Sequence, residues 1–246
     1  MFKTKTGEAT TIVEQNQGFT PSFAQVKAKD TVAKEETTKP KFVFLVGGLA
    51  GSGKTSHMLP LIHHLTEELA LSVNYLDKDL IGRTMPGATS PQVYDAMMAR
   101  AVIADEDVII HEGNIVGNLS LFRDYVRSQH DLGATVICLD FQCSDAKMQH
   151  ARLVERAAVD SDAKQRDLKK LDFDFYTATD RPGEIAKRDK QIGFNQDLIG
   201  AGIINFKVID TTTASIQENV ASIVKCMYDL NPNASRAHAL RLVAGM

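Results

Sequence analysis

The chain has 246 residues, of which 43% are hydrophobic and 24% are charged, as in an ordinary soluble globular protein with one sizeable core. Its formal net charge of −3 excludes a global attraction to nucleic acid or to an anionic membrane, but it leaves room for a local basic groove. No segment approaches the roughly 18 consecutive apolar residues of a membrane span, and the N-terminus lacks an apolar signal core. The three cysteines form no CxxC pair, which indicates reduced thiols. We therefore expect a cytoplasmic protein that does not contact a membrane.

Residues 1–40 differ in composition from the rest of the chain. They contain six lysines and five acidic residues, and their few apolar residues follow no sustained period. Such a segment cannot bury enough apolar surface to offset the entropy lost on ordering. We expect a disordered tail, with a docking arm as the alternative interpretation.

From Lys41 onward, short apolar segments rich in Val and Ile alternate with segments of helical length. This alternation is typical of parallel βαβ units whose sheet is covered by helices on both faces. We therefore predict an α/β fold with a parallel five-stranded sheet flanked by helices. The predicted strands are 42–46, 73–76, 108–110, 134–141 and 206–209, and the predicted helices are about 53–70, 89–104, 118–131, 144–158 and 214–229.

The region 159–200 interrupts the alternation, because it is rich in charge and lacks an apolar period. We expect a helical lid over about 152–200, inserted into a folded domain that spans 41–230. Residues 231–246 would then form a C-terminal extension, which begins with a short final helix.

The first predicted strand leads into a complete phosphate-binding motif, G-x-x-x-x-G-K-[ST], placed between a strand and a helix as the motif requires. Phosphate oxygens are held there by consecutive backbone N–H groups, so the loop must curl in a way that glycine permits. The helix that follows points its positive end at the anion. The motif predicts a P-loop nucleotide-binding protein. Its residues are Gly48, Leu49, Ala50, Gly51, Ser52, Gly53, Lys54 and Thr55.

Two residues of this loop carry side-chain chemistry. We expect Lys54 to contact the β- and γ-phosphates of ATP and the Thr55 hydroxyl to hold Mg²⁺. Because motors, switches and kinases share this loop, the remaining residues must indicate what is done with the phosphate.

The second predicted strand is followed by Asp77, Asp79 and Arg83, at the edge where open α/β sheets bind ligands. A carboxylate here can take the proton of an acceptor hydroxyl, and an arginine four residues later can hold an anionic part of the substrate. We assign these roles to Asp79 and Arg83, whereas Asp77 is expected to orient the turn. The alternative is a polar loop with an Asp cap.

The third predicted strand ends in the sequence DVIIHEGN, in which Glu112 occupies the place of the acidic residue that orients Mg²⁺ in P-loop proteins. Glu112 is therefore a candidate metal ligand or substrate contact, whereas His111 is expected to be a polar strand-end residue. The fourth predicted strand ends near Asp140, a second candidate for the metal. The sequence leaves open which of the two acidic residues serves it.

Arg152 and Arg156 are four residues apart and so share one face of a helix. Two arginines ahead of a charged segment suit a lid that closes over phosphates and stabilises the transferred charge. A solvated charged helix is the alternative. Farther along, the turn 210–212 follows the last predicted strand, where an adenine base could lie or where an N-cap cluster could form.

Together these residues resemble the small P-loop kinases that include the polynucleotide 5′-kinases and the zeta-toxin-like kinases. In the polynucleotide kinases an Asp and an Arg follow the second strand, a place that Asp79 and Arg83 take with the spacing longer by one. Arg152 and Arg156 match the R-x-x-x-R pair of their lid. The EGN sequence at 112–114 is similar to the E-G-T of the zeta-type kinases.

The resemblance covers about 42–228 and implies transfer of the ATP γ-phosphate to a hydroxyl. Related phage kinases phosphorylate hydroxymethylated bases within DNA, including hydroxymethyluracil. The leading hypothesis is an ATP- and Mg²⁺-dependent kinase whose acceptor is a hydroxyl of a nucleotide or nucleic acid, either a 5′-OH or a hydroxymethylated base. One alternative is a zeta-like kinase of a nucleotide-sugar or other small metabolite. Another is an NTP-driven switch or assembly ATPase, which would not need an acceptor site.

Deletion of residues 1–38 is expected to leave a folded and active domain, because this segment lacks the apolar content of a core. The melting temperature of the shortened chain, measured by circular dichroism, should stay within a few degrees of that of the full chain. A large drop would show that the segment packs on the domain.

Overall fold

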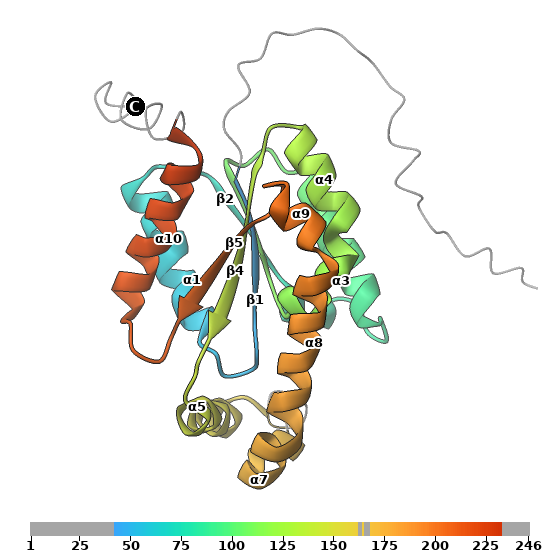
Figure 1. The fold of residues 1–246 in the computed structure, drawn as a ribbon, viewed down its shortest axis with the longest axis vertical. Helices are drawn as coiled ribbons and strands as arrows, with labels where there is room; N and C mark the ends of the chain where they lie inside the picture. Colours follow the sequence, from blue (N-terminus) through green and yellow to red (C-terminus); the bar gives the residue numbers. More distant parts are fainter. Residues whose placement is uncertain (1–41, 162–163, 165–167, 233–246) are drawn as a thin grey trace, which may run out of the picture. The chain divides into compact units, whose positions relative to one another are not determined.

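The structure is a computed structural model that describes residues 42–161, 164 and 168–232. Its centre is a sheet of five parallel strands in the order β2-β3-β1-β4-β5 (Figure 1). This arrangement confirms the predicted α/β fold. Four strands are one or two residues longer than predicted, and β4 is shifted by one residue at equal length. The strands are β1 (Phe42–Gly48), β2 (Val73–Asp77), β3 (Val108–Glu112), β4 (Thr135–Gln142) and β5 (Asn205–Asp210).

Helices cover both faces of the sheet. Those on one face are α1 and α10, and those on the other include α3, α4 and α8 (Figure 1). The helical elements are α1 (Lys54–His63), η2 (His64–Glu68), α2 (Lys78–Arg83), α3 (Ser90–Val102), η3 (Val116–Phe122), α4 (Arg123–Asp131), α5 (Ala146–Val159), η4 (Leu168–Leu171), α7 (Phe173–Phe175), η5 (Tyr176–Asp180), α8 (Arg181–Phe194), α9 (Gln196–Gly200) and α10 (Ile216–Leu230).

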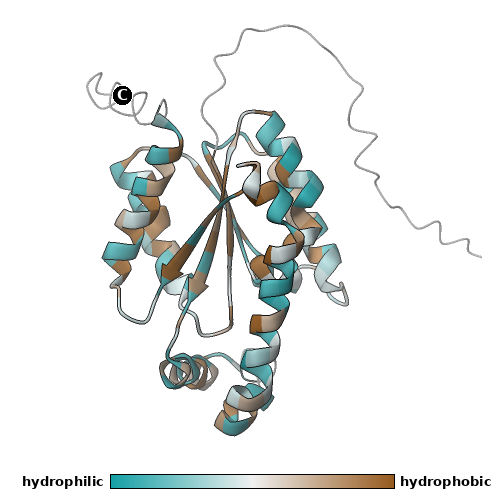
Figure 2. Cartoon of the chain, viewed as in Figure 1, coloured by the Kyte–Doolittle hydropathy of each residue, from teal (hydrophilic) through white to brown (hydrophobic). Residues whose placement is uncertain are grey.

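The alternation of side chains along β1 builds two cores. Phe42, Phe44 and Val46 pack toward α1 and α10, whereas Val43 and Leu45 pack toward α3, η3 and α4. All seven residues of β1 are buried, as expected for the central strand of a parallel sheet covered on both faces. Hydrophobic residues accordingly lie along the strands and on the helix surfaces that face them (Figure 2).

The expected helical lid region carries helices and no strand within its described residues. Its longest element after α5 is α8, which packs against η3, the segment that follows β3. Gln191 of α8 fixes this packing, since its Oε1 accepts a hydrogen bond from Ser120 N at 2.9 Å. In this position α8 places side chains beside the carboxyl ends of the strands.

The expected tail, 1–40, and residues 233–246 of the expected C-terminal extension lie outside the described residues. Among the residues that the structure describes, none of the helices is long and apolar enough to span a bilayer.

His111 of β3 is completely buried rather than exposed at a strand end. Its Nε2 lies 2.9 Å from the Tyr125 hydroxyl of α4, and Phe122 packs edge-on against its ring. Burial lowers the pKa of His111 from 6.5 to about 3, because the charged imidazolium would lose its hydration. His111 is therefore a neutral core residue.

This burial predicts that stability depends on pH. Below pH 6.5 the unfolded chain binds a proton at His111 that the folded chain does not, so the stabilisation is complete above pH 6.5 and is lost as the pH falls toward 3. In urea titrations at pH 7 and pH 5, the wild type should lose more unfolding free energy than the His111→Gln variant. A His130→Gln control, at an exposed position of α4, should follow the wild type. Equal losses in wild type and His111→Gln would contradict the prediction.

Candidate functional site

The phosphate-binding loop joins the central strand β1 to α1. Its curl depends on glycine, since Gly48 and Gly51 have φ values of +133° and +74°. Space is also restricted, because a Cβ at Gly48 would lie 2.3 Å from Phe141 O and one at Gly51 would lie 2.5 Å from Gln149 O. The loop must therefore carry glycine at both positions.

Side chains from other elements hold the carbonyl oxygens of the loop. His57 of α1 donates from Nδ1, Gln149 of α5 from Nε2, and Thr211 after β5 from Oγ1. Bonds of this kind turn the carbonyls outward and so leave the loop amides for an anion. The distances are 2.7 Å from His57 to Gly53 O, 2.8 Å from Gln149 to Ala50 O, and 2.9 Å from Thr211 to Ser52 O.

His57 itself is fixed by a second bond. Its Nε2 accepts from Asn219 Nδ2 of α10 at 3.1 Å, and the same amide donates to Asp210 O at 2.8 Å. The ring therefore carries its proton on Nδ1. Burial lowers its pKa, with the Arg152 charge adding to the effect, so the neutral form is favoured. This chain of bonds connects the loop to the end of β5.

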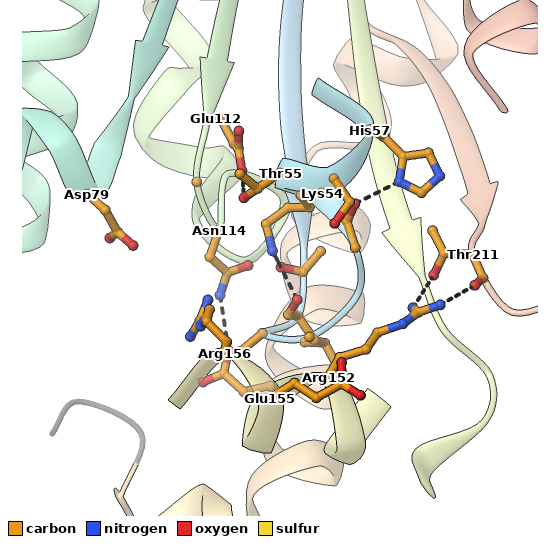
Figure 3. Close-up of a pocket in the computed structure, with 18 of the residues that line it drawn as sticks. Lys54, Thr55, His57, Asp79, Glu112, Asn114, Arg152, Glu155, Arg156 and Thr211 are labelled. Atoms are coloured by element: carbon orange, nitrogen blue, oxygen red, sulfur yellow. Dashed lines mark hydrogen bonds between the residues drawn. The ribbon is translucent and has the colours of Figure 1, made fainter. Parts of the chain in front are cut away.

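Lys54 is half-buried and lies across the loop. Its Nζ donates to Gly48 O at 2.8 Å and to Leu49 O at 2.9 Å. The pKa of Lys54 is lowered to about 8, chiefly by burial and also by the nearby Arg156 charge, against the opposing charge of Glu112. The ammonium group therefore stands where phosphate oxygens would enter the loop, close to a second cation (Figure 3).

Thr55 and Glu112 meet at the end of β3. The Thr55 hydroxyl donates to Glu112 Oε1 at 2.7 Å, and the Tyr75 hydroxyl of β2 donates to Glu112 Oε2. A hydroxyl and a carboxylate are the oxygen ligands that Mg²⁺ takes in proteins. The two predicted metal residues thus lie together, and the donor set fits the ion.

Asp140, which the sequence made a rival of Glu112, does not line the cleft, although its charge reaches Lys54. It is completely buried in β4, outside the residues that line the cleft, and its Oδ2 accepts from Gln142 Nε2 at 2.7 Å. Arg188 of α8 approaches the same oxygen to 3.8 Å. Burial raises the pKa of Asp140. The structure thus places Asp140 in a contact between the sheet and α8.

A cleft of about 930 Å³ opens over the loop at the carboxyl ends of the strands. The strand order divides it, because β1 carries the loop at the centre, β5 lies at one edge and β2 at the other. We call the part next to β5 the base half, after the adenine base that the sequence led us to expect there, and the part next to β2 and β3 the acceptor half, after the acceptor expected beside Asp79.

In the base half, Arg152 of α5 is bound to the turn after β5. Its Nη2 donates to Thr211 O at 2.8 Å and its Nη1 donates to Thr211 Oγ1 at 3.2 Å (Figure 3). The other predicted arginine, Arg156, extends to the opposite side of the loop from Arg152 (Figure 3). The two arginines of one helix face therefore reach different parts of the cleft.

In the acceptor half, Asp77 caps α2, since its Oδ1 accepts from Asp79 N at 2.6 Å and from Leu80 N at 3.1 Å. This confirms that Asp77 orients the turn. Asp79 is exposed and lines the cleft, whereas Arg83 is exposed at the end of α2, outside the lining residues. The predicted role of Arg83 as an acceptor contact stays a prediction.

Several lining residues come from the helical segment between α5 and β5, where the sequence offered no motif. Arg181 begins α8, and its Nε donates to Gln149 Oε1, the residue that holds Ala50 of the loop. Gln149 and Glu184 could not be found from spacing, because their partners are far away in the chain. The lining residues of this segment after α5 are Lys170, Tyr176, Asp180, Arg181 and Glu184.

Comparisons with known proteins give distant likenesses. No family model matches the chain, and no curated protein matches it. Solved structures that resemble it are the crystal structure of APE1195 (18% identity, TM-score 0.47, covering 78% of this chain and 98% of that one), an uncharacterized protein from Eubacterium ventriosum (14%, 0.42, 75% and 97%) and the Mycobacterium tuberculosis APS kinase in complex with AMPPNP and APS (15%, 0.43, 76% and 98%). At these values the function must be inferred from the residues of the site.

The position of Lys54 predicts how nucleotide binding depends on pH. The ammonium is charged below its pKa of about 8 and loses its charge above it, so affinity for a non-hydrolysable ATP analogue should fall between pH 7.5 and 9.5. Titration calorimetry should show weaker binding by the Lys54→Met variant, by about tenfold or more at pH 7.5, and little further loss at high pH. A variant that binds like the wild type would contradict the assignment.

Proposed function

We propose that the protein is an ATP- and Mg²⁺-dependent kinase that transfers the γ-phosphate of ATP to an acceptor hydroxyl. One observation carries the proposal: a complete phosphate loop shares a cleft with a second group of side chains, next to β2 and β3, that includes Asp79. The charge of Asp79 reaches Lys54, where it opposes the lowering of that pKa. A carboxylate within electrostatic reach of the loop lysine suits a base that acts beside the γ-phosphate.

Each group of the cleft then has one role. Backbone amides of the loop and Lys54 bind the phosphates, and Arg156 stabilises the charge on the transferred group. Arg152 is bound to Thr211. It therefore helps to form the binding place of the adenine base and does not close over the γ-phosphate. Thr55 and Glu112 would hold Mg²⁺, which when bound offsets phosphate charge.

The reaction is a displacement at phosphorus. The acceptor oxygen forms a bond to the γ-phosphorus while the bond from that phosphorus to the β,γ-bridging oxygen breaks. The leaving ADP keeps the electron pair, and the proton of the acceptor hydroxyl passes to the Asp79 carboxylate. Asp79 is the residue that we propose as this base, since it lines the acceptor half.

An NTP-driven switch or ATPase is the competing function. It would need the phosphate loop and the metal residues but no acceptor half. Incubation of the full chain with γ-labelled ATP, Mg²⁺ and separate panels of DNA, hydroxymethylated DNA, RNA, nucleosides, nucleotide-sugars and simple sugars distinguishes the two. We expect label in an acceptor, whereas label found only as free phosphate would favour the ATPase.

The sequence favoured a nucleotide or nucleic acid as the acceptor, with a small metabolite as the alternative. Nucleic acid needs a groove with excess positive charge. In the part of the cleft that the structure describes, six cationic side chains are balanced by six acidic ones. The balance favours a small acceptor over a polymer, and the same panel tests this point.

Asp79→Asn should lower kcat by roughly 10²–10⁴-fold and change ATP affinity little, because the amide keeps the shape but cannot accept the proton. Initial rates with the labelled acceptor, at varied ATP, measure both quantities. Asp77→Asn is the matched control, since Asp77 caps α2 and should affect stability more than turnover. A defect confined to ATP binding would move Asp79 to the nucleotide side.

A further inference from the structure

Two carboxylates from different elements line the acceptor half. Asp79 lies on α2, and Glu184 lies on α8. Glu184 is held against the core by Asn114, whose Nδ2 donates to Glu184 Oε2 at 3.1 Å. The pKa of the buried Tyr94 hydroxyl is raised, chiefly by burial, and the charges of Asp79 and Glu184 both add to the rise. Both carboxylates are therefore within electrostatic reach of the same buried group.

Most positively charged side chains of the cleft contact groups other than Asp79 and Glu184. Arg152 is bound in the base half, and Arg181 Nη2 donates to Cys143 O at 3.1 Å and to Ser144 O at 3.3 Å. Lys170 lies 3.6 Å from Asp180.

Among the described lining residues that directly follow β2 and β3, Lys78 is the one cation. Its ammonium lies over the Tyr94 ring, 5.4 Å from the centroid. Arg156 of α5 lies on the same side of the loop (Figure 3). Apart from Lys54 and Glu112, the described part of the acceptor half thus holds two cations, Lys78 and Arg156, against three carboxylates, Asp77, Asp79 and Glu184, so negative charge is in excess.

We infer that the acceptor is a small neutral or cationic molecule with several hydroxyl or amine groups, such as a sugar, an amino sugar or a nucleoside, and that Glu184 selects it. The inference rests on the proposed kinase function. Hydroxyl and amine donors gain charge-assisted hydrogen bonds from the carboxylates. A phosphate group next to the reacting hydroxyl would instead face like charges.

The first test separates acceptors by charge before labelling. A low-molecular-weight extract of the source cells is passed over an anion exchanger, and the flow-through, the retained fraction, purified DNA and purified RNA are each incubated with the full chain, Mg²⁺ and γ-labelled ATP. Label in the flow-through supports the inference. Label mainly in the retained fraction or in nucleic acid overturns it while the kinase function stands. Label only in free phosphate overturns both.

The second test changes the charge of Glu184 and keeps its contact. In the Glu184→Gln variant the amide oxygen can still accept from Asn114, so the wall should stay in place. We expect KM for the acceptor recovered from the flow-through to rise on the order of tenfold, the usual effect of losing a hydrogen bond to a charged group, while KM for ATP is unchanged. Use of the retained fraction should increase relative to the flow-through.

Asp189→Asn is the control for this variant, because it removes the same charge from α8 at an exposed position outside the cleft. It should keep both KM values. If Glu184→Gln leaves the acceptor KM unchanged, or alters KM for ATP by the same factor, Glu184 does not select the acceptor and the inference is wrong.

Discussion

The outward hydrogen bonding of the phosphate loop is the constraint on which the rest of the site depends. Backbone carbonyls and amides of a tight loop compete for the same space, and an anion is bound only if the carbonyls turn away. Here His57, Gln149 and Thr211 each hold one carbonyl. These residues come from α1, α5 and the turn after β5, so the conformation of the loop depends on how the helices pack on the sheet.

The same bonds couple the loop to the surrounding walls. Gln149 accepts from Arg181 of α8 while it donates to Ala50, so one buried side chain links α8 to the loop. His57 is linked through Asn219 to the end of β5. A shift of α8 or of the end of β5 would therefore move atoms of the loop, and these are the atoms proposed to bind phosphate.

The strand order gives the two sides of the cleft different side chains. Because β1 is central, the loop has an edge strand on either side, and the two sides carry different chemistry. Arg152 and Thr211 lie next to β5, whereas Asp79, Glu112 and Asn114 lie next to β2 and β3. This division matches the two binding places, for the adenine base and for the acceptor, that the proposed transferase needs; a hydrolytic switch needs no acceptor place.

The sequence by itself determined the elements and the loop. Strong local signals fixed them: Val- and Ile-rich strands, helical segments between them, and a glycine motif that no other turn chemistry explains. The same signals made Asp77 a turn residue, as the structure shows, and placed Thr55 at the start of α1 and Glu112 at the end of β3, where the two side chains meet.

Only the tertiary structure decided how the cleft is divided. Arg152 and Arg156 share a helix face, yet they reach opposite sides of the loop, and Arg83 lies outside the cleft although its spacing suited an acceptor contact. Glu184 meets Asn114 across 70 residues of chain. Such contacts depend on how α8 packs against η3, which local periodicity and spacing do not specify, because they describe one element at a time.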